Sequence, residues 1–286
     1  MGNALATPLK NAFRPIAVLI LTFTIEKGPI ARIFRNWNFP FLYLKESLLF
    51  WLDFIRYRRI EGAEKFRPED LSPVYFQRNA AVTVDPHYFH AHIWALSHLN
   101  KLNPADHVDV SSSYGFVGMA SVLTKIRYIE FNPPKITTEN VELLKGDISK
   151  LPLKDGEVYS LSCIHAAEHV GLGRYGDHLD PLGTKKAAAE LERVLAPGGT
   201  LLFALPIGRQ RVQFNGQRIH SGGQIAEYFS GLVLKEYSGI NDEGRFLENI
   251  PLDSLDQSYC GCGLFMFRKT TTEEQPSRPL GTTSTP

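Results

Sequence analysis

The sequence contains, in order, VYSLSCI (158–164), TKKAAAELERVL (184–195) and TLLFALP (200–206). The first and last are apolar runs of strand length, whereas the middle one has the spacing of an amphipathic helix. The apolar face of that helix carries Ala188, Leu191, Val194 and Leu195. Pro197-Gly198-Gly199 predicts a sharp turn into the second strand. This order is typical of a parallel sheet with helices packed on it.

The same alternation extends in both directions along the chain. Asp85-Pro86 predicts the start of a helix that runs to about Asn100, because Asp caps helix N-termini and Pro is favoured at the first helical position. Further apolar runs of strand length lie at 107–111, 126–130, 141–146, 232–238 and 263–269. We therefore predict an α/β fold with a doubly wound, mostly parallel sheet that binds ligands beyond the carboxyl ends of its strands.

The composition excludes several protein classes. The 286 residues are 43% hydrophobic and 21% charged, with a formal net charge of +1. These values exclude a disordered or fibrous chain, and the near-neutral charge argues against a nucleic-acid partner. Three cysteines, Cys163, Cys260 and Cys262, cannot all pair within one chain. A reducing compartment, the cytoplasm, is therefore expected.

The charge is distributed unevenly along the chain. Residues 1–60 contain nine basic and three acidic side chains and include the apolar helix candidate FLYLKESLLFWLDFIRYRR (41–59). This helix either packs on the main domain or lies on an anionic membrane surface with its apolar face down. The apolar run at 16–25 is shorter than the roughly 20 residues that a membrane span needs. We predict a basic, helical extension at 1–84, a domain at 85–269 and a disordered tail at 270–286.

Polar residues follow the predicted strands at their carboxyl ends. The small-residue turn at 111–115 (SSSYG) follows the first strand and enters a helix. The second strand ends in Glu130, 21 residues after Asp109, where an acidic side chain can accept both hydroxyls of a ribose. The third strand ends in Asp147 and Ile148, a carboxylate and an apolar neighbour that could clasp a purine.

Over roughly residues 105–270 the sequence resembles the class I S-adenosylmethionine-dependent methyltransferases, most specifically in GDISKLPLKDGEVYSLSCIHAAEHV (146–170) and ELERVLAPGGTLLFALP (190–206). The segments 169–199 and 206–221 resemble an uncharacterised branch of that superfamily that often accompanies polysaccharide-biosynthesis genes. The resemblance implies a Rossmann-like, seven-stranded sheet whose last strand is antiparallel, with S-adenosylmethionine as cofactor. The implied cofactor-binding residues are Asp109, Ser111, Ser113, Gly115, Glu130, Asp147, Ile148 and Cys163.

The turn after the first strand departs from the family pattern Gly-x-Gly-x-Gly. Ser111 and Ser113 replace the first two glycines, and only Gly115 remains. Glycine permits positive φ and a close backbone approach to a ligand, whereas serine adds a Cβ and a hydroxyl donor. A shifted cofactor pose is compatible with these serines. The alternative is a catalytically inactive relative of the fold that serves as a binding or scaffold protein.

Methyl transfer requires donor and acceptor to be held in line, and a base if the acceptor is a hydroxyl. The segments after the fourth and fifth strands flank the expected reaction centre and supply six catalytic candidates: His165, Glu168, His169, Asp177, His178 and His220. The same segments supply the substrate-binding candidates Arg174, Arg211, Asn215 and Arg218. The arginines among them suit an anionic acceptor, because arginine forks bind anions. We predict O-methylation of a saccharide or other small hydroxylated acceptor.

Two motifs match known signatures outside their usual context. HAAEH (165–169) matches the H-x-x-E-H zinc signature, but it begins at the end of a buried strand, and we interpret Glu168-His169 as the opening of the next helix. GLGRYG (171–176) matches the dinucleotide fingerprint without directly following a strand, and we interpret it as a mobile loop over the pocket. The predicted helix at 86–100 carries four histidines without a metal-binding pair, so no metal site is expected: His87, His90, His92 and His98.

Overall fold

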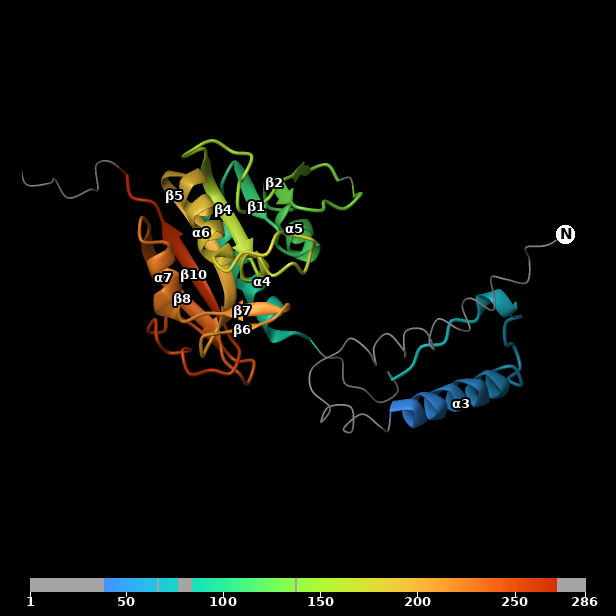
Figure 1. Ribbon diagram of the computed structural model, residues 1–286. Coiled ribbons are helices and arrows are strands. Elements are labelled where there is room, and N and C mark those ends of the chain that lie inside the picture. Colours follow the sequence, from blue (N-terminus) through green and yellow to red (C-terminus); the bar gives the residue numbers. More distant parts are fainter. Residues whose placement is uncertain (1–38, 66, 77–83, 137, 272–286) are drawn as a thin grey trace, which may run out of the picture. The chain divides into compact units, whose positions relative to one another are not determined.

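The computed structural model describes residues 39–65, 67–76, 84–136 and 138–271. The chain divides into two compact units, Met1–Thr83 and Val84–Pro286 (Figure 1). The apolar run at 16–25 lies outside the described residues, as do nearly all residues of the predicted tail at 270–286.

The second unit is built on one large twisted sheet with the strand order β3-β2-β1-β4-β5-β10-β8-β9. Neighbouring strands from β3 to β5 are parallel, and β10 is antiparallel to both β5 and β8. The strands are β1 (Asp106–Val110), β2 (Lys125–Glu130), β3 (Val141–Lys145), β4 (Val158–Ile164), β5 (Leu195–Ile207), β8 (Val233–Ile240), β9 (Phe246–Leu247) and β10 (Gly261–Arg268).

The predicted α/β fold is confirmed, including the antiparallel last strand. The sheet has eight strands rather than seven, because the two-residue strand β9 pairs with the outer edge of β8. A strand of two residues has no recognisable alternation in sequence. The strand order reverses between β1 and β4, and this switch point is where open α/β sheets bind ligands.

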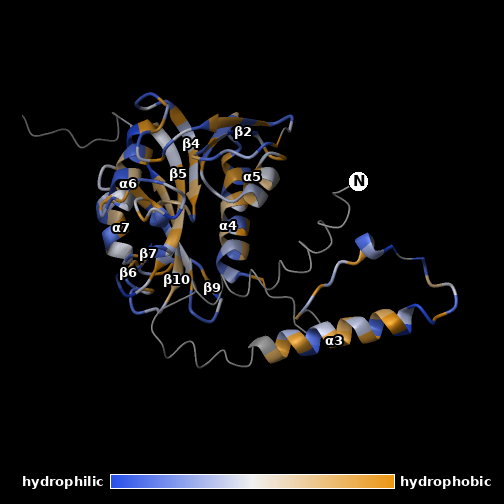
Figure 2. Cartoon of the chain, turned by 45° about the vertical axis from the view of Figure 1, so that its right-hand side comes forward, coloured by the Kyte–Doolittle hydropathy of each residue, from blue (hydrophilic) through white to orange (hydrophobic). Residues whose placement is uncertain are grey.

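Helices cover both faces of this sheet (Figures 1 and 2). Helices α4 (Pro86–Leu102) and α5 (Tyr114–Ala120) pack on one face through residues such as Trp94 and Phe116. Helices α6 (Gly183–Val194) and α7 (Gly222–Tyr228) pack on the other, with Leu191 fully buried. Asp85 caps α4 by accepting a hydrogen bond from the His87 backbone N–H at 2.9 Å, as the sequence predicts.

Two local predictions differ from the structure. Pro197-Gly198-Gly199 lies within β5 rather than before it, because Gly198 takes a φ of +79° and bends the strand without ending it. Glu168 and His169 form a single 3₁₀ turn, η2 (Ala167–His169), and α6 begins only at Gly183. The positive φ values at Gly171, Gly173 and Gly176 keep the intervening chain from continuing as a helix.

A small hairpin that the sequence did not predict follows β5. Strands β6 (Arg211–Gln213) and β7 (Gln217–Ile219) pair antiparallel, and a bridge between Ile207 and His220 joins the hairpin to the end of β5. The hairpin therefore lies beside the carboxyl end of the sheet, close to η2.

The first unit contains helix α3 (Phe39–Tyr57) and the short 3₁₀ helix η1 (Pro68–Asp70). One side of α3 packs on its own unit, since Tyr43 contacts the rings of Tyr75 and Phe76 and Glu46 accepts a hydrogen bond from the Phe76 backbone N–H at 3.1 Å. Hydrophobic and hydrophilic residues alternate along α3 (Figure 2). Exposed apolar side chains recur every three or four residues along the helix: Phe41, Leu44, Leu48, Trp51 and Ile55. Among the described helices, none combines the length and the apolar character that crossing a membrane requires.

Candidate active site

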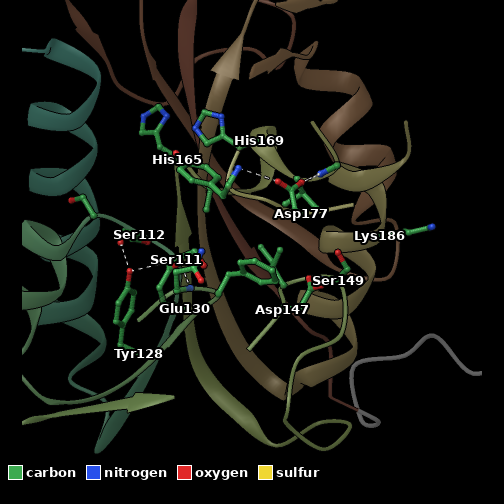
Figure 3. A pocket seen from close by; sticks show the side chains of 18 of the residues that line it. Ser111, Ser112, Tyr128, Glu130, Asp147, Ser149, His165, His169, Asp177 and Lys186 are labelled. Atoms are coloured by element: carbon green, nitrogen blue, oxygen red, sulfur yellow. Dashed lines mark hydrogen bonds between the residues drawn. The ribbon is translucent and has the colours of Figure 1, made fainter. Parts of the chain in front are cut away.

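A pocket of about 730 Å³ opens at the carboxyl ends of β1, β2 and β4, where the strand order reverses. This volume is within the range of roughly 300–1,000 Å³ that is typical of small-molecule sites. Figure 3 shows Glu130 close to Ser111 and Ser112, with His165 and His169 at the end of the pocket away from Asp147.

The serine turn, residues 111–113, leads from β1 into α5 at the pocket wall. Ser111 has a φ of +56°, a left-handed conformation that glycine adopts readily and serine rarely. Ser113 caps α5 by accepting from the Phe116 backbone N–H at 3.3 Å, and its Oγ lies 3.1 Å from His92 Nε2. A Cβ added at Gly115 would meet no atom within 4 Å. The turn thus keeps the backbone form of a glycine-rich turn despite its serines.

Asp109, which is buried in β1, accepts hydrogen bonds from the serine turn. Its carboxylate accepts hydrogen bonds from the Ser112 backbone N–H at 3.1 Å, from Ser112 Oγ at 2.7 Å and from Ser162 Oγ. Burial raises the pKa of Asp109 to about 6, although these hydrogen bonds act in the opposite direction. Asp109 does not line the pocket itself but fixes the segment that does.

Glu130 ends β2 and lines the pocket. Its Oε1 accepts a hydrogen bond from the Asn132 backbone N–H at 3.1 Å, and its Oε2 lies 3.2 Å from the Tyr128 hydroxyl. A carboxylate oxygen can accept more than one hydrogen bond, so Glu130 retains capacity toward a ligand. Asp147 and Ile148 line the same part of the wall, with Asp147 Oδ1 bonded to the Ser149 backbone N–H at 2.7 Å.

A cluster of His165, Glu168, His169 and Cys262 lies at the end of β4. His165 Nδ1 is 3.2 Å from Glu168 Oε1, and its Nε2 is 3.4 Å from Cys262 Sγ. Burial alone would lower the pKa of His165, but Cys262 and Glu168 raise it well above its usual value. Burial alone would raise the pKa of Glu168, but its contacts with the two histidines lower it. Glu168 is therefore a buried carboxylate, and its Oε2 has no hydrogen-bond partner among the described residues.

His169 lines the pocket and has a fixed tautomer. Its Nδ1 lies 2.7 Å from the carbonyl oxygen of Gly216 in the β6–β7 hairpin. Because a carbonyl only accepts, Nδ1 carries the proton and Nε2 of the neutral ring has a free lone pair. Nε2 is 3.7 Å from Glu168 Oε1, so the carboxylate stabilises the ring once Nε2 is protonated.

The loop from Gly171 to Asp180 forms another wall of the pocket. Asp177 accepts hydrogen bonds from the Gly171 backbone N–H at 2.6 Å and the Tyr175 backbone N–H at 3.2 Å. Arg218 holds both ends of the loop, since its guanidinium donates to the carbonyl oxygens of Val170 and, at 2.7 Å, Asp180. The side chains of Asp177 and Arg218 thus anchor the loop by hydrogen bonds to its backbone.

Residues 104–203 match the family described as "Methyltransferase domain". The match covers about a third of the chain. This finding confirms the predicted enzyme class, whose methyl donor is S-adenosylmethionine. Residues 156–260 match a second family, described as a Caenorhabditis protein of unknown function. Neither match tests the predicted link to polysaccharide biosynthesis.

Several solved structures are similar to this chain. A putative methyltransferase in complex with the Haloferax volcanii Trm112 activator is 17% identical, with 64% of this chain and 90% of that one covered at a TM-score of 0.47. A geranyl diphosphate methyltransferase with GPP and sinefungin is 14% identical, with 64% and 78% covered at 0.47. A Burkholderia thailandensis 1,6-didemethyltoxoflavin-N1-methyltransferase with S-adenosylhomocysteine is 14% identical, with 67% and 93% covered at 0.45. No curated protein shows significant similarity to the sequence.

The pocket brings together half of the candidate residues. Those that line it are Ser111, Ser113, Glu130, Asp147, Ile148, His165, His169, Asp177 and His178. Those that do not are Asp109, Gly115, Cys163, Glu168, Arg174, Arg211, Asn215, Arg218 and His220. Among the described residues, no group of three or more His, Cys, Asp or Glu side chains is arranged to hold a metal ion.

Some of the candidates outside the pocket have other partners. His220 is buried between Gln224, at 2.8 Å, and Thr184, at 3.3 Å. Arg211 lies over the ring of Tyr259, with its guanidinium carbon 4.7 Å from the ring centre. These contacts hold the hairpin and the helix after it, and they direct both side chains away from the pocket.

Several residues that line the pocket were not among the candidates from the sequence. Tyr88 reaches the pocket from α4, with its ring 4.8 Å from that of His165. Tyr128 was identifiable in principle, because it stands two residues before Glu130 in a strand and therefore shares its face. Tyr175 and Lys186 also line the pocket, but they come from a loop and a helix whose position the sequence does not specify.

Proposed function

We propose that this domain binds S-adenosylmethionine in the pocket and transfers its methyl group to a hydroxyl of a small acceptor. The observation that carries the proposal is the place of Glu130, whose carboxylate shares the pocket with the turn that follows β1. In this proposal Glu130 accepts the ribose hydroxyls, Asp147 and Ile148 flank the adenine, and the serine turn contacts the amino-acid part. The volume of the pocket fits a ligand of this size.

The cofactor supplies an electrophilic methyl group, and the protein has to activate the acceptor. We propose His169 as the base that takes the proton of the acceptor hydroxyl at Nε2. The Gly216 carbonyl holds the required tautomer, and the Glu168 carboxylate stabilises the imidazolium that results. Glu168 is then a positioning residue, because it acts through His169 and does not line the pocket.

The proposed acceptor is a saccharide or a similar hydroxylated molecule. The rings of Tyr88 and Tyr175 line the pocket next to His165 and His169, and the polar side chains of Asp177 and His178 line it as well. Aromatic rings pack on the C–H faces of sugars, while carboxylate and imidazole groups bond to their hydroxyls. This combination supports a polar ring-shaped acceptor better than a purely apolar one.

Calorimetric titration of the full chain with S-adenosylmethionine tests the proposal. Binding is expected, and Glu130→Ala should lower the affinity by about tenfold or more, because a buried ligand diol loses its acceptor. The matched control is Glu243→Ala, which removes an exposed carboxylate outside the pocket and should leave the affinity unchanged. Folded protein that gives no heat at millimolar cofactor would contradict the proposal and favour the alternative, a catalytically inactive scaffold.

We also propose that the first unit contacts an anionic membrane surface. The apolar side chains of α3 recur at helical spacing, and the basic cluster Arg56, Arg58 and Arg59 is exposed at the end of the helix. Liposome flotation tests this: the full chain should bind vesicles containing phosphatidylserine, and Leu48→Glu with Trp51→Glu should release it. A chain that never binds such vesicles contradicts the proposal.

A further inference from the structure

A series of buried polar side chains is connected by hydrogen bonds to the serine turn. His107 of β1 lies between two serines of β4, with its Nδ1 2.7 Å from Ser160 Oγ and its Nε2 2.8 Å from Ser162 Oγ. Ser162 Oγ also donates to Asp109 Oδ2. The strands place these groups on one face, because β1 and β4 are neighbours and Asp109 stands opposite Ser162.

In this hydrogen-bonded series, every donor points toward Asp109. Burial lowers the pKa of His107 to about 3, so its ring is neutral and carries a single N–H. Ser162 gives its hydroxyl hydrogen to Asp109 and must therefore accept from His107 Nε2–H. Nδ1 then accepts from Ser160. Every donor points toward Asp109, which is the arrangement that an ionised carboxylate requires.

The hydrogen-bonded series ends at the serine turn. Asp109 accepts from both the backbone N–H and the hydroxyl of Ser112, whose Oγ in turn accepts from the Ile164 backbone N–H at 2.9 Å. Ser112 follows Ser111, the residue with the left-handed φ. These bonds fix the turn from the side that faces away from the pocket.

We infer that His107 and Ser162 are positioning residues for cofactor binding: they hold the Asp109 carboxylate, and through it the serine turn, in the conformation that binds the cofactor. The inference rests on the proposed function, since it concerns the same ligand. A protonated Asp109 has a donor of its own and cannot accept all three hydrogen bonds as now arranged. Cofactor affinity should therefore fall when Asp109 takes up a proton.

The surroundings of Asp109 raise its pKa, so that its carboxylate takes up a proton slightly below neutral pH. Burial raises its pKa to about 6, the hydrogen bonds from Ser162 and Ser112 act against the rise, and the charge of Glu130 adds to it. The titratable groups near it are His107 on its own strand, Tyr128 and Glu130 on β2, and Cys163 on β4. Removing the Ser162 hydroxyl takes away one stabilising bond and should raise the pKa of Asp109 further.

Calorimetric titration of the full chain with S-adenosylhomocysteine between pH 5.5 and 8 tests the inference. The affinity of the wild-type chain should fall about fourfold between pH 7.5 and 5.5, because a group with a pKa of about 6 is mostly protonated at the lower pH. Ser162→Ala should move the midpoint of this fall to higher pH, and Asp109→Asn should flatten the profile. The matched control is Ser238→Ala, which removes a fully buried serine hydroxyl of β8 that is not part of the hydrogen-bonded series. This variant should keep the wild-type pH profile.

A loss of affinity that is equal at every pH in Ser162→Ala would mark a merely structural serine and overturn the inference. A wild-type affinity that is constant over this range would overturn it as well. Failure of the folded wild-type chain to bind at any pH contradicts the proposed function itself, so the two failures are distinguishable. If Ser162→Ala does not fold, Asp109→Asn decides: a flat profile supports the inference, and a wild-type profile overturns it.

Discussion

Ser112 and Glu130 both lie within hydrogen-bond distance of one hydroxyl group, that of Tyr128. The Tyr128 Oη lies 2.9 Å from the carbonyl oxygen of Ser112 and 3.2 Å from Oε2 of Glu130. The turn after β1 and the carboxylate at the end of β2 are thus connected through a single side chain, which is itself almost fully buried. This connection fixes the spacing between the two parts of the proposed cofactor site.

Tyr128→Phe tests this connection. The variant keeps the ring in the core and removes only the hydroxyl, so the spacing between Ser112 and Glu130 is no longer fixed. A neutral hydrogen bond contributes about 1 kcal/mol, which corresponds to an affinity for S-adenosylhomocysteine about fivefold lower. Calorimetry at pH 7.5 measures this loss. Tyr237→Phe, another buried tyrosine on the far side of the sheet, serves as the control and should bind normally. Unchanged affinity in Tyr128→Phe would show that the shared hydroxyl has no role in binding.

His169→Ala separates chemistry from binding. If His169 is the base, the variant should lose about 10²- to 10⁴-fold in kcat, while its affinity for S-adenosylhomocysteine changes less than about twofold. The measurement is single-turnover methyl transfer to an accepted saccharide, compared with His90→Ala. His90 lies on α4 and does not line the pocket, so its variant should retain wild-type kcat. Equal kcat in both variants would remove His169 from the mechanism.

Arg218→Ala should destabilise the loop from Gly171 to Asp180. The side chain is only 6% exposed. Its loss removes the donor to the Val170 carbonyl oxygen and leaves the Asp180 carbonyl oxygen with only the Gly183 backbone N–H. We expect a loss of about 2–4 kcal/mol in the free energy of unfolding, measured by urea denaturation. Arg209→Ala removes an exposed guanidinium nearby and should change the free energy of unfolding by less than about 0.5 kcal/mol. Similar values for the two variants would contradict the anchoring role of Arg218.

Asp109→Asn should change how stability depends on pH. In the wild-type chain the pKa of Asp109 is raised to about 6 in the folded state, so its contribution to stability is complete below the unfolded-state pKa near 4 and is lost as the pH rises through 6. The variant lacks this contribution. The difference between the free energies of unfolding, variant minus wild type, should therefore be larger at pH 8 than at pH 4 by on the order of 2–3 kcal/mol. Urea denaturation at both pH values measures it, and a difference that is independent of pH would contradict a raised pKa.

The sequence was sufficient to predict the sheet and the ends of its strands. The runs that end at Glu130 and Ile164 correspond closely to β2 and β4, because most of the side chains that these strands bury are apolar. Glu130 and Asp147 could be placed at the pocket for the same reason: a strand end in a parallel sheet has a defined position.

The polar contacts around the pocket were not predictable in this way. Arg218 looks like a ligand-binding arginine in sequence, yet it bonds to two carbonyl groups about forty residues earlier in the chain. His107 reads as part of an ordinary strand, and its role depends on serines more than fifty positions later. Such contacts depend on how distant strands come into register, and local patterns contain no information about register.

The most direct measurement is a crystal structure of the chain with bound S-adenosylhomocysteine. The account predicts that the ribose hydroxyls lie within hydrogen-bond distance of the Glu130 carboxylate, with the amino-acid part of the ligand at the serine turn. A ligand bound elsewhere, or a ribose that does not contact Glu130, would contradict the central claim.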